Sequence, residues 1–150
     1  MNRKERLSPC RLYGIVDMGY TAENQLLSVT EKLLAGGLGI LQLRAKNCAP
    51  ERIEQLGSQL APLCRKHGCL FIINDYPEIA LSTGADGVHL GQDDGPLAPV
   101  RAMLGPDCII GRSTHSPEQA LEAFREQADY IGFGPLFPTG TKPGRPAIGL

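Results

Sequence analysis

Three polar side chains alternate along one short stretch of the chain and could together bind a charged ligand. Gln42, Arg44 and Lys46 are separated by single residues, so all three point the same way if the backbone there is extended. An amide and two cations suit an anionic ligand or a polar heterocycle. Salt bridges within the protein are the alternative explanation for Arg44 and Lys46.

Asp75 and Asp94 each follow a further apolar run and offer a pair of carboxylates. Mg²⁺ binds carboxylate oxygens and usually completes its shell with water and substrate phosphate oxygens, so the pair is a candidate metal site. Asp93 is a competing ligand beside Asp94. The alternative for each aspartate is to cap the following helix, and for Asp94 also to form a turn.

Residues 134–142 (GPLFPTGTK) combine glycines, threonine hydroxyls and a lysine. Such a loop can surround a phosphate with N–H, hydroxyl and ammonium donors, although it is not a GxxxxGK[ST] loop. A generic surface loop is the alternative. None of the three histidines completes a recognisable triad with a nucleophile. His89 fits either a buried structural role or a catalytic role, His115 could face the same rim as Ser113, and His67 ends a helix.

Short apolar runs alternate with segments of helical periodicity, and this order must position the polar residues. The predicted strands are residues 12–17, 39–44, 70–75, 87–91, 109–113 and 130–134. The predicted helices are residues 24–35, 50–67, 77–83, 97–104 and 116–127. Brief apolar strands of this kind are typical of a parallel sheet buried on both faces, with right-handed crossovers.

The ends of these strands distinguish two α/β architectures. A doubly wound sheet usually carries a glycine-rich phosphate turn after its first strand, but residues 18–21 (MGYT) have no such fingerprint. A barrel places polar residues at the carboxyl ends of successive strands, which is the pattern here. We therefore expect an α/β fold of the (β/α)8 TIM-barrel type, with about six βα units in this chain.

Length and composition limit the function classes. The 150 residues predict one domain spanning 1–150, with a flexible N-terminal segment at 1–10. The net charge of −1 and the absence of Trp argue against a nucleic-acid partner. No apolar stretch is long enough for a signal peptide or a membrane span. Five cysteines without a CxxC spacing predict reduced thiols in a cytoplasmic protein.

Taken together, the motifs resemble the thiamine phosphate synthase family. The matching stretches are residues 42–46 (QLRAK), 71–75 (FIIND), 84–94 (GADGVHLGQDD), 110–116 (IGRSTHS) and 134–142 (GPLFPTGTK). Each is modest alone, but their order and spacing together are specific, and the resemblance extends from about residue 12 onward. It implies a (β/α)8 barrel and a transferase of thiamine biosynthesis.

The resemblance also implies substrates and residue roles. The substrates are 4-amino-5-hydroxymethyl-2-methylpyrimidine diphosphate and 4-methyl-5-(2-phosphoethyl)thiazole, which yield thiamine phosphate and diphosphate by a dissociative mechanism. Mg²⁺ is the implied cofactor, held by Asp75 and Asp94, and Arg44, Ser113 and Lys142 are the implied catalytic residues. The implied substrate contacts are Gln42, Arg44, Lys46, Asn74, Ser113, Thr139, Thr141 and Lys142. A homo-oligomer is compatible with the sequence.

Two departures leave alternatives open. Arg112 stands where the family generally has a smaller or less polar residue, and it points either into the helical layer or toward the rim. The chain also stops before the last two βα units expected of a barrel, so a catalytically inactive truncated barrel is one alternative. The other is a thiazole tautomerase-like relative that uses a histidine for proton transfer. Retention of Asp75, Asp94 and the two lysines at 46 and 142 favours the synthase.

Overall fold

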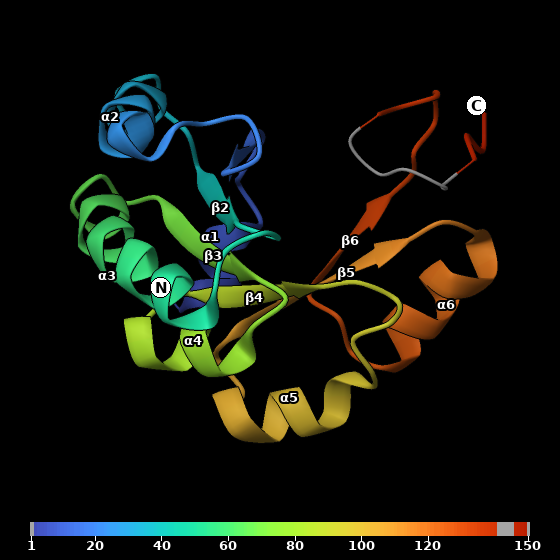
Figure 1. Ribbon diagram of the computed structural model, residues 1–150. Helices are drawn as coiled ribbons and strands as arrows, with labels where there is room; N and C mark the ends of the chain where they lie inside the picture. Colours follow the sequence, from blue (N-terminus) through green and yellow to red (C-terminus); the bar gives the residue numbers. More distant parts are fainter. Residues whose placement is uncertain (1, 141–145, 150) are drawn as a thin grey trace.

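Strands and helices alternate throughout the computed structural model, which describes residues 2–140 and 146–149 (Figure 1). The strands are β1 (Tyr13–Asp17), β2 (Ile40–Arg44), β3 (Leu70–Asn74), β4 (Gly87–Leu90), β5 (Ile109–Thr114) and β6 (Tyr130–Phe133). The helices are α1 (Arg3–Leu7), the short 3-10 helix η1 (Glu23–Gln25), α2 (Leu26–Ala35), α3 (Pro50–Lys66), α4 (Pro77–Thr83), α5 (Leu97–Leu104) and α6 (Pro117–Arg125).

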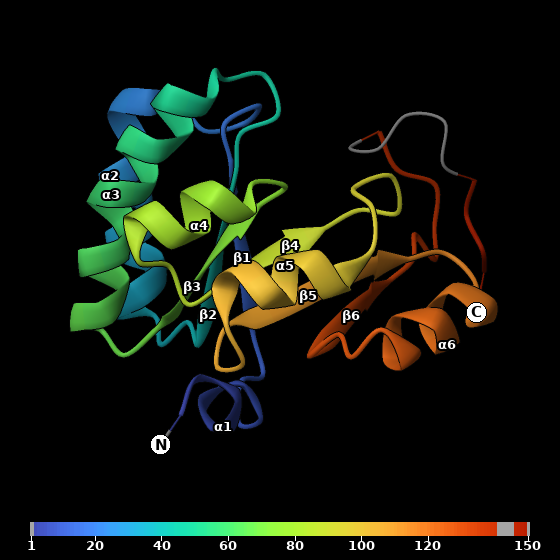
Figure 2. The ribbon, with the colours of Figure 1, turned by 90° about the horizontal axis from the view of Figure 1, so that it is seen from below.

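The six strands form one parallel sheet in the order β1-β2-β3-β4-β5-β6. The sheet curls, and helices α2 to α6 cover its outer face, as Figures 1 and 2 show. Every consecutive pair of strands is therefore joined by a crossover that passes over the same face. This arrangement is an open section of a (β/α) barrel and confirms the predicted fold class. None of the described helices combines the length and apolar character needed to cross a bilayer.

Two apolar clusters stabilise the sheet on its two faces. The larger cluster lies between the strands and the helices and includes Leu41, Phe71 and Ile110, all at most 1% exposed. The smaller one fills the inner face with Ile40, Leu70, Ile72 and Ile109. Because strand residues alternate between faces, neighbours such as Ile40 and Leu41 belong to different clusters. Several of the remaining inward positions nearer the carboxyl ends are polar, among them Gln42, Arg44 and Ser113, whereas Ile15 of β1 is apolar.

Local signals in the sequence account for most element boundaries. Proline occupies the first turn of α3, α4 and α6, where its missing N–H costs nothing. Ser116 caps α6 by accepting the N–H of Gln119 at 3.3 Å. Gly84 ends α4 with φ of 65°, which glycine adopts without strain. The helix predicted from residue 24 starts later, because residues 23–25 form η1 instead.

The edge strands differ from the prediction of burial on both faces. Within the described chain, β1 and β6 each have one neighbouring strand, so part of each remains uncovered. Ile15 of β1 is 54% exposed, and Ile131 and Phe133 of β6 are 41% and 46% exposed. The expectation holds for β3, of which every residue is buried.

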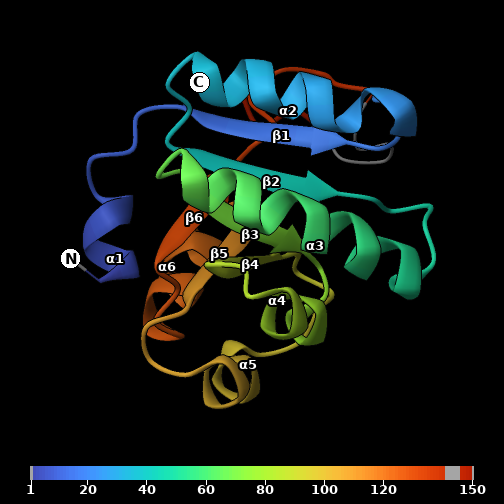
Figure 3. The same ribbon diagram turned by 90° about the vertical axis from the view of Figure 1, so that its left-hand side faces the viewer.

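Helix α1 lies at the amino ends of the strands (Figure 3), within the segment expected to be flexible. Its cations meet two aspartates that each accept a backbone N–H from a strand, at 2.9 and 2.8 Å. Arg3 Nε lies 3.2 Å from Asp86, and Lys4 Nζ lies 2.9 Å from Asp129. Five mostly polar residues carry no apolar periodicity, so sequence reasoning missed this helix.

Candidate active site

A cavity of about 920 Å³ opens where the carboxyl ends of the strands meet. All six strands or the loops that follow them contribute to its lining. The predicted site residues that line it are Gln42, Arg44, Lys46, Asn74, Asp75, Asp94, Ser113 and Thr139. Thr141 and Lys142 lie outside the described residues. The curled sheet thus brings together the polar residues of successive strand ends, as the barrel interpretation requires.

Arg44, at the end of β2, is paired with an aspartate that the sequence analysis did not select. Its guanidinium forms an ion pair with Asp17 at the end of β1, and both side chains are mostly buried. The second carboxylate oxygen of Asp17 accepts the N–H of Gly19 at 2.8 Å. Asp17 therefore orients Arg44 at the cavity wall. Its place at a strand end was the available signal, the same one that identified Asp75.

Asp75 follows β3 and has an unusual backbone. Its φ is 70°, a left-handed conformation that is uncommon for a residue other than glycine. Its N–H donates to the carbonyl of His89 at 2.9 Å, which fixes the turn. The carboxylate lies 2.7 Å from Nζ of Lys46. The N-cap of α4 is Tyr76, with no side-chain cap, so the helix-cap explanation of Asp75 is wrong.

Asp94 lies in the loop between β4 and α5. Its carboxylate accepts the N–H of Gly91 at 2.5 Å and so shapes a turn, while the N-cap of α5 is Pro96. Asp93 lines the same cavity. The described residues contain no group of three or more acidic, histidine or cysteine side chains placed to hold a metal by themselves. A Mg²⁺ ion here would need oxygens from water and ligand phosphates, the coordination that Mg²⁺ usually adopts.

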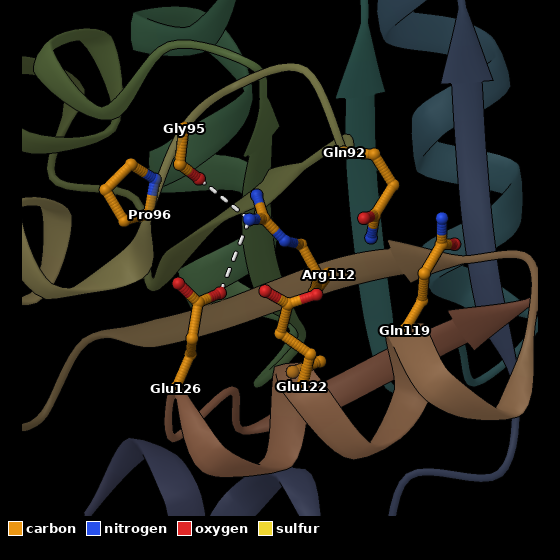
Figure 4. Close-up of a pocket in the computed structure, with 8 residues that line it drawn as sticks. Gln92, Gly95, Pro96, Arg112, Gln119, Glu122 and Glu126 are labelled. Atoms are coloured by element: carbon orange, nitrogen blue, oxygen red, sulfur yellow. Dashed lines mark hydrogen bonds and ion pairs between the residues drawn. The ribbon is translucent and has the colours of Figure 1, made fainter.

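Arg112 projects to the outer side of β5, so it faces the helical layer and not the rim (Figure 4). It is only 6% exposed and lines a second cavity, of about 280 Å³. Its guanidinium donates to the carbonyls of Gly91 and Gly95, both at 2.7 Å, and lies 3.4 Å from Glu126 of α6. These two carbonyls flank the loop that carries Asp94. Residues 91–95, which include Asp93 and Asp94, form the acidic loop. Arg112 therefore holds the acidic loop from the side of the helical layer.

A row of hydrogen bonds crosses the inner face of the sheet below the rim. Gln42 Nε2 lies 2.8 Å from the Tyr13 hydroxyl, which lies 2.7 Å from the Tyr130 hydroxyl. The Tyr130 hydroxyl lies 3.0 Å from Nδ1 of His89, and Nε2 of His89 lies 2.9 Å from the Ser113 hydroxyl. The two tyrosines bridge the edge strands β1 and β6. Sequence reasoning left His89 open and missed both tyrosines.

Partial burial raises the pKa of both tyrosines further above neutral pH. It raises the pKa of Tyr13 to about 12, against smaller opposing effects of the hydrogen bonds from Tyr130 and Gln42. Burial, and then the neighbouring Tyr13, raise the pKa of Tyr130 as well. Both hydroxyls therefore keep their protons at neutral pH and act as neutral hydrogen-bonding groups.

His115 does not share this row. Its Nδ1 donates to the carbonyl of Gly134 at 2.5 Å, which ties the end of β5 to the loop after β6. The cysteines, predicted to be reduced, are all free thiols, and Cys64, Cys69 and Cys108 are buried.

The fold and the cavity define a class of protein. It is a barrel-type α/β protein whose strand ends combine cations, carboxylates and amides around one cavity, which suits a charged ligand with a polar ring. The chain matches the model of the family described as "Thiamine monophosphate synthase" over residues 12–150. The chain belongs to this family.

Individual relatives agree with the family match. The chain is 43% identical over 147 residues to a thiamine-phosphate synthase of Gloeobacter violaceus, covering 98% of this chain and 42% of the relative. It is 47% identical over 142 residues to that of Thermus thermophilus, covering 93% and 68%. Among solved structures, a thiamine phosphate pyrophosphorylase from Pyrococcus furiosus superposes with a TM-score of 0.82 at 37% identity, covering 99% and 68%. The chain thus spans between about two fifths and two thirds of the length of these relatives.

Proposed function

We propose that this chain forms the pyrimidine diphosphate site of a thiamine phosphate synthase. The enzyme joins 4-amino-5-hydroxymethyl-2-methylpyrimidine diphosphate to 4-methyl-5-(2-phosphoethyl)thiazole and releases diphosphate. One observation carries the proposal: Arg44 and Lys46 line the same cavity as Asp75 and Asp94 in a chain of this family. Cations and metal-binding carboxylates side by side suit a diphosphate ester.

The proposed reaction needs no nucleophile from the protein. The C–O bond between the pyrimidine methylene and the diphosphate breaks, and its electron pair leaves with the diphosphate. The thiazole nitrogen then donates its lone pair to the methylene carbon, which forms the new C–N bond. Arg44, Lys46 and Lys142 stabilise the charge on the departing diphosphate, which is the main electrostatic task of the site. Asn74, which is 9% exposed, contacts the pyrimidine diphosphate, with Gln42 and Ser113 at the ring.

The carboxylates fit a role for Mg²⁺. Asp75 and Asp94 line one cavity, come from neighbouring loops, and each has a second carboxylate oxygen beyond the one described above. When bound, Mg²⁺ supplies further positive charge to the diphosphate. We assign the thiazole phosphate to Thr139 and Thr141. A cytoplasmic location and a homo-oligomeric state remain predictions.

A condensation assay tests this function against its alternatives. The chain is incubated with both substrates, with and without Mg²⁺, and thiamine phosphate is quantified. The proposal expects Mg²⁺-dependent product. A tautomerase-like relative would instead isomerise a thiazole phosphate carboxylate without Mg²⁺, a function that no relative described above is named for. Tight binding of the pyrimidine diphosphate without product would identify an inactive truncated barrel.

A further inference from the structure

The hydrogen-bonded row on the inner face ends in two proposed substrate contacts, Gln42 and Ser113. We propose that this row, the Tyr–Tyr–His chain, makes Ser113 a donor and Gln42 an acceptor toward the ligand and so selects an aminopyrimidine over an oxopyrimidine. The Tyr–Tyr–His chain consists of Tyr13, Tyr130 and His89. The inference rests on the proposed function, because it concerns recognition of the pyrimidine ring by the same cavity.

The direction of the hydrogen bonds follows from counting protons. The Gln42 amide nitrogen can only donate, so the Tyr13 hydroxyl accepts there and has its own proton for Tyr130. Tyr130 has then accepted from Tyr13 and gives its proton to Nδ1 of His89. A neutral imidazole that accepts at Nδ1 carries its proton on Nε2. The reverse direction would leave the Tyr13 proton without an acceptor in this row.

The outcome at each end is a fixed polarity. Nε2 of His89 donates to the Ser113 hydroxyl, so the Ser113 proton is available to a ligand in the cavity. At the other end, the Gln42 amide nitrogen donates to Tyr13, which fixes the orientation of the amide and leaves the carbonyl Oε1 to accept from a ligand. The cavity therefore presents one donor and one acceptor whose roles are set by the Tyr–Tyr–His chain, which lines the same cavity.

Close packing keeps the Tyr–Tyr–His chain in this arrangement. The rings of Tyr13 and Tyr130 lie 5.6 Å apart, and the His89 ring stacks on Tyr130 at 5.5 Å. Gly111 lies beneath Tyr130, where an added Cβ would be only 2.1 Å from the ring, so only glycine admits the tyrosine there. Gln92 fixes the backbone of Ser113 by donating to its carbonyl at 2.6 Å.

A 4-aminopyrimidine matches this polarity. Its exocyclic amino group donates and its adjacent ring nitrogen accepts, so Gln42 Oε1 can take the amino proton and Ser113 can donate to the ring nitrogen. The 4-oxo analogue has the opposite pattern, a carbonyl acceptor beside a ring N–H donor. Its carbonyl oxygen would face the Gln42 carbonyl oxygen, and its ring N–H would face the proton of the Ser113 hydroxyl. A site built around specific hydrogen bonds rejects such an analogue strongly, because buried polar groups are left unpaired.

The first test reads the tautomer of His89 directly. Long-range ¹H–¹⁵N correlation spectra of the ¹⁵N-labelled chain at neutral pH identify the protonated ring nitrogen, and the missing signals of a His89→Gln variant assign it. The proposal expects a proton on Nε2 and none on Nδ1. A proton on Nδ1, or on both nitrogens, would overturn the proposal. This measurement requires no substrate, so it is independent of the proposed function.

The second test measures ligand selection by isothermal titration with Mg²⁺ present. The 4-aminopyrimidine diphosphate and its 4-oxo analogue are titrated into the wild type, Tyr130→Phe and the control Tyr76→Phe, a partly buried tyrosine outside the row. We expect Tyr130→Phe to reduce the preference for the amino ligand about tenfold, the effect of losing one neutral hydrogen bond, and Tyr76→Phe to retain it. An unchanged preference in a folded Tyr130→Phe contradicts the proposal. Equal binding of both ligands by the wild type contradicts the selection alone, whereas binding of neither contradicts the proposed function as well.

Discussion

Nζ of Lys46 lies 2.7 Å from the carboxylate of Asp75, so a cation expected to meet the diphosphate neutralises a carboxylate expected to meet the metal. The two partners differ in mobility. The backbone N–H of Asp75 is bonded to the carbonyl of His89, and its carboxylate is 17% exposed, whereas the Lys46 side chain is 53% exposed. Lys46 is therefore the group that can move from Asp75 to an arriving phosphate.

Replacing Lys46 should separate metal binding from diphosphate binding. In Lys46→Met the competing cation is gone, so Mg²⁺ alone should bind about two- to fivefold more tightly, the range expected for a partly exposed ion pair. The pyrimidine diphosphate should bind more weakly, because one of its cations is lost. Isothermal titration of each ligand measures both changes, with the exposed Lys66→Met as the control. Weaker Mg²⁺ binding in Lys46→Met would contradict the exchange of partners.

Replacing Arg112 should destabilise the chain and loosen the acidic loop. Arg112→Met leaves Glu126 and the carbonyls of Gly91 and Gly95 without a buried partner, which should lower the free energy of unfolding by about 3 kcal/mol. Urea denaturation measures this loss. The exposed Arg125→Met should change stability by less than about 0.5 kcal/mol. Equal stability of both variants would mean that Arg112 does not fasten the loop.

The order of elements and the residues around the cavity could largely be predicted from the sequence. Parallel strands carry polar residues at their carboxyl ends, so Arg44, Asp75 and Ser113 were identified from position alone. The pairing of Arg44 with Asp17 depends on the register of β1 with β2, which no local pattern specifies. The tyrosines were missed for a related reason: Tyr13 and Tyr130 are far apart in the chain and meet only when the sheet curls.

The direction of Arg112 needed the structure as well. Side chains of a strand point alternately to its two faces, so an error of one residue in the assigned register moves Arg112 to the opposite face. In the structure Ser113 points inward to His89, which requires Arg112 to point outward to the carbonyls of the acidic loop. Helix α1, before β1, could not be predicted for a different reason. It is stabilised by a capping box and by ion pairs to distant aspartates, and it has no apolar periodicity.

The partly buried Tyr13 should make the stability fall at high pH. Its pKa is about 12 in the folded chain and about 10 when unfolded, so above pH 10 the unfolded state loses a proton that the folded state keeps. The contribution of Tyr13 to the free energy of unfolding is therefore fully present below about pH 10. It falls by about 2–3 kcal/mol as the pH rises to about 12. Urea denaturation between about pH 9 and about pH 11, a range that spans the onset of this loss, should show a shallower decline for Tyr13→Phe than for the exposed Tyr20→Phe. Identical slopes would contradict this contribution of Tyr13.

Lys142 should affect turnover far more than folding. In Lys142→Ala the departing diphosphate loses one of its cations, so the rate of thiamine phosphate formation should fall by about a hundredfold or more. The free energy of unfolding should change by less than about 0.5 kcal/mol. Steady-state assays and urea denaturation on the same preparation compare the two effects. Turnover at the wild-type rate would remove Lys142 from the site.

The most direct test of the proposed function is the affinity of the chain for the pyrimidine diphosphate with and without Mg²⁺, measured by isothermal titration. We expect tight binding only when Mg²⁺ is present. Asp75→Asn should lose at least about a hundredfold in this Mg²⁺-dependent affinity, because an amide replaces a charged metal ligand. The exposed Asp107→Asn should bind as the wild type does. Binding of the same strength without Mg²⁺, or no binding at all, would contradict the assignment of this cavity as a metal-assisted diphosphate site.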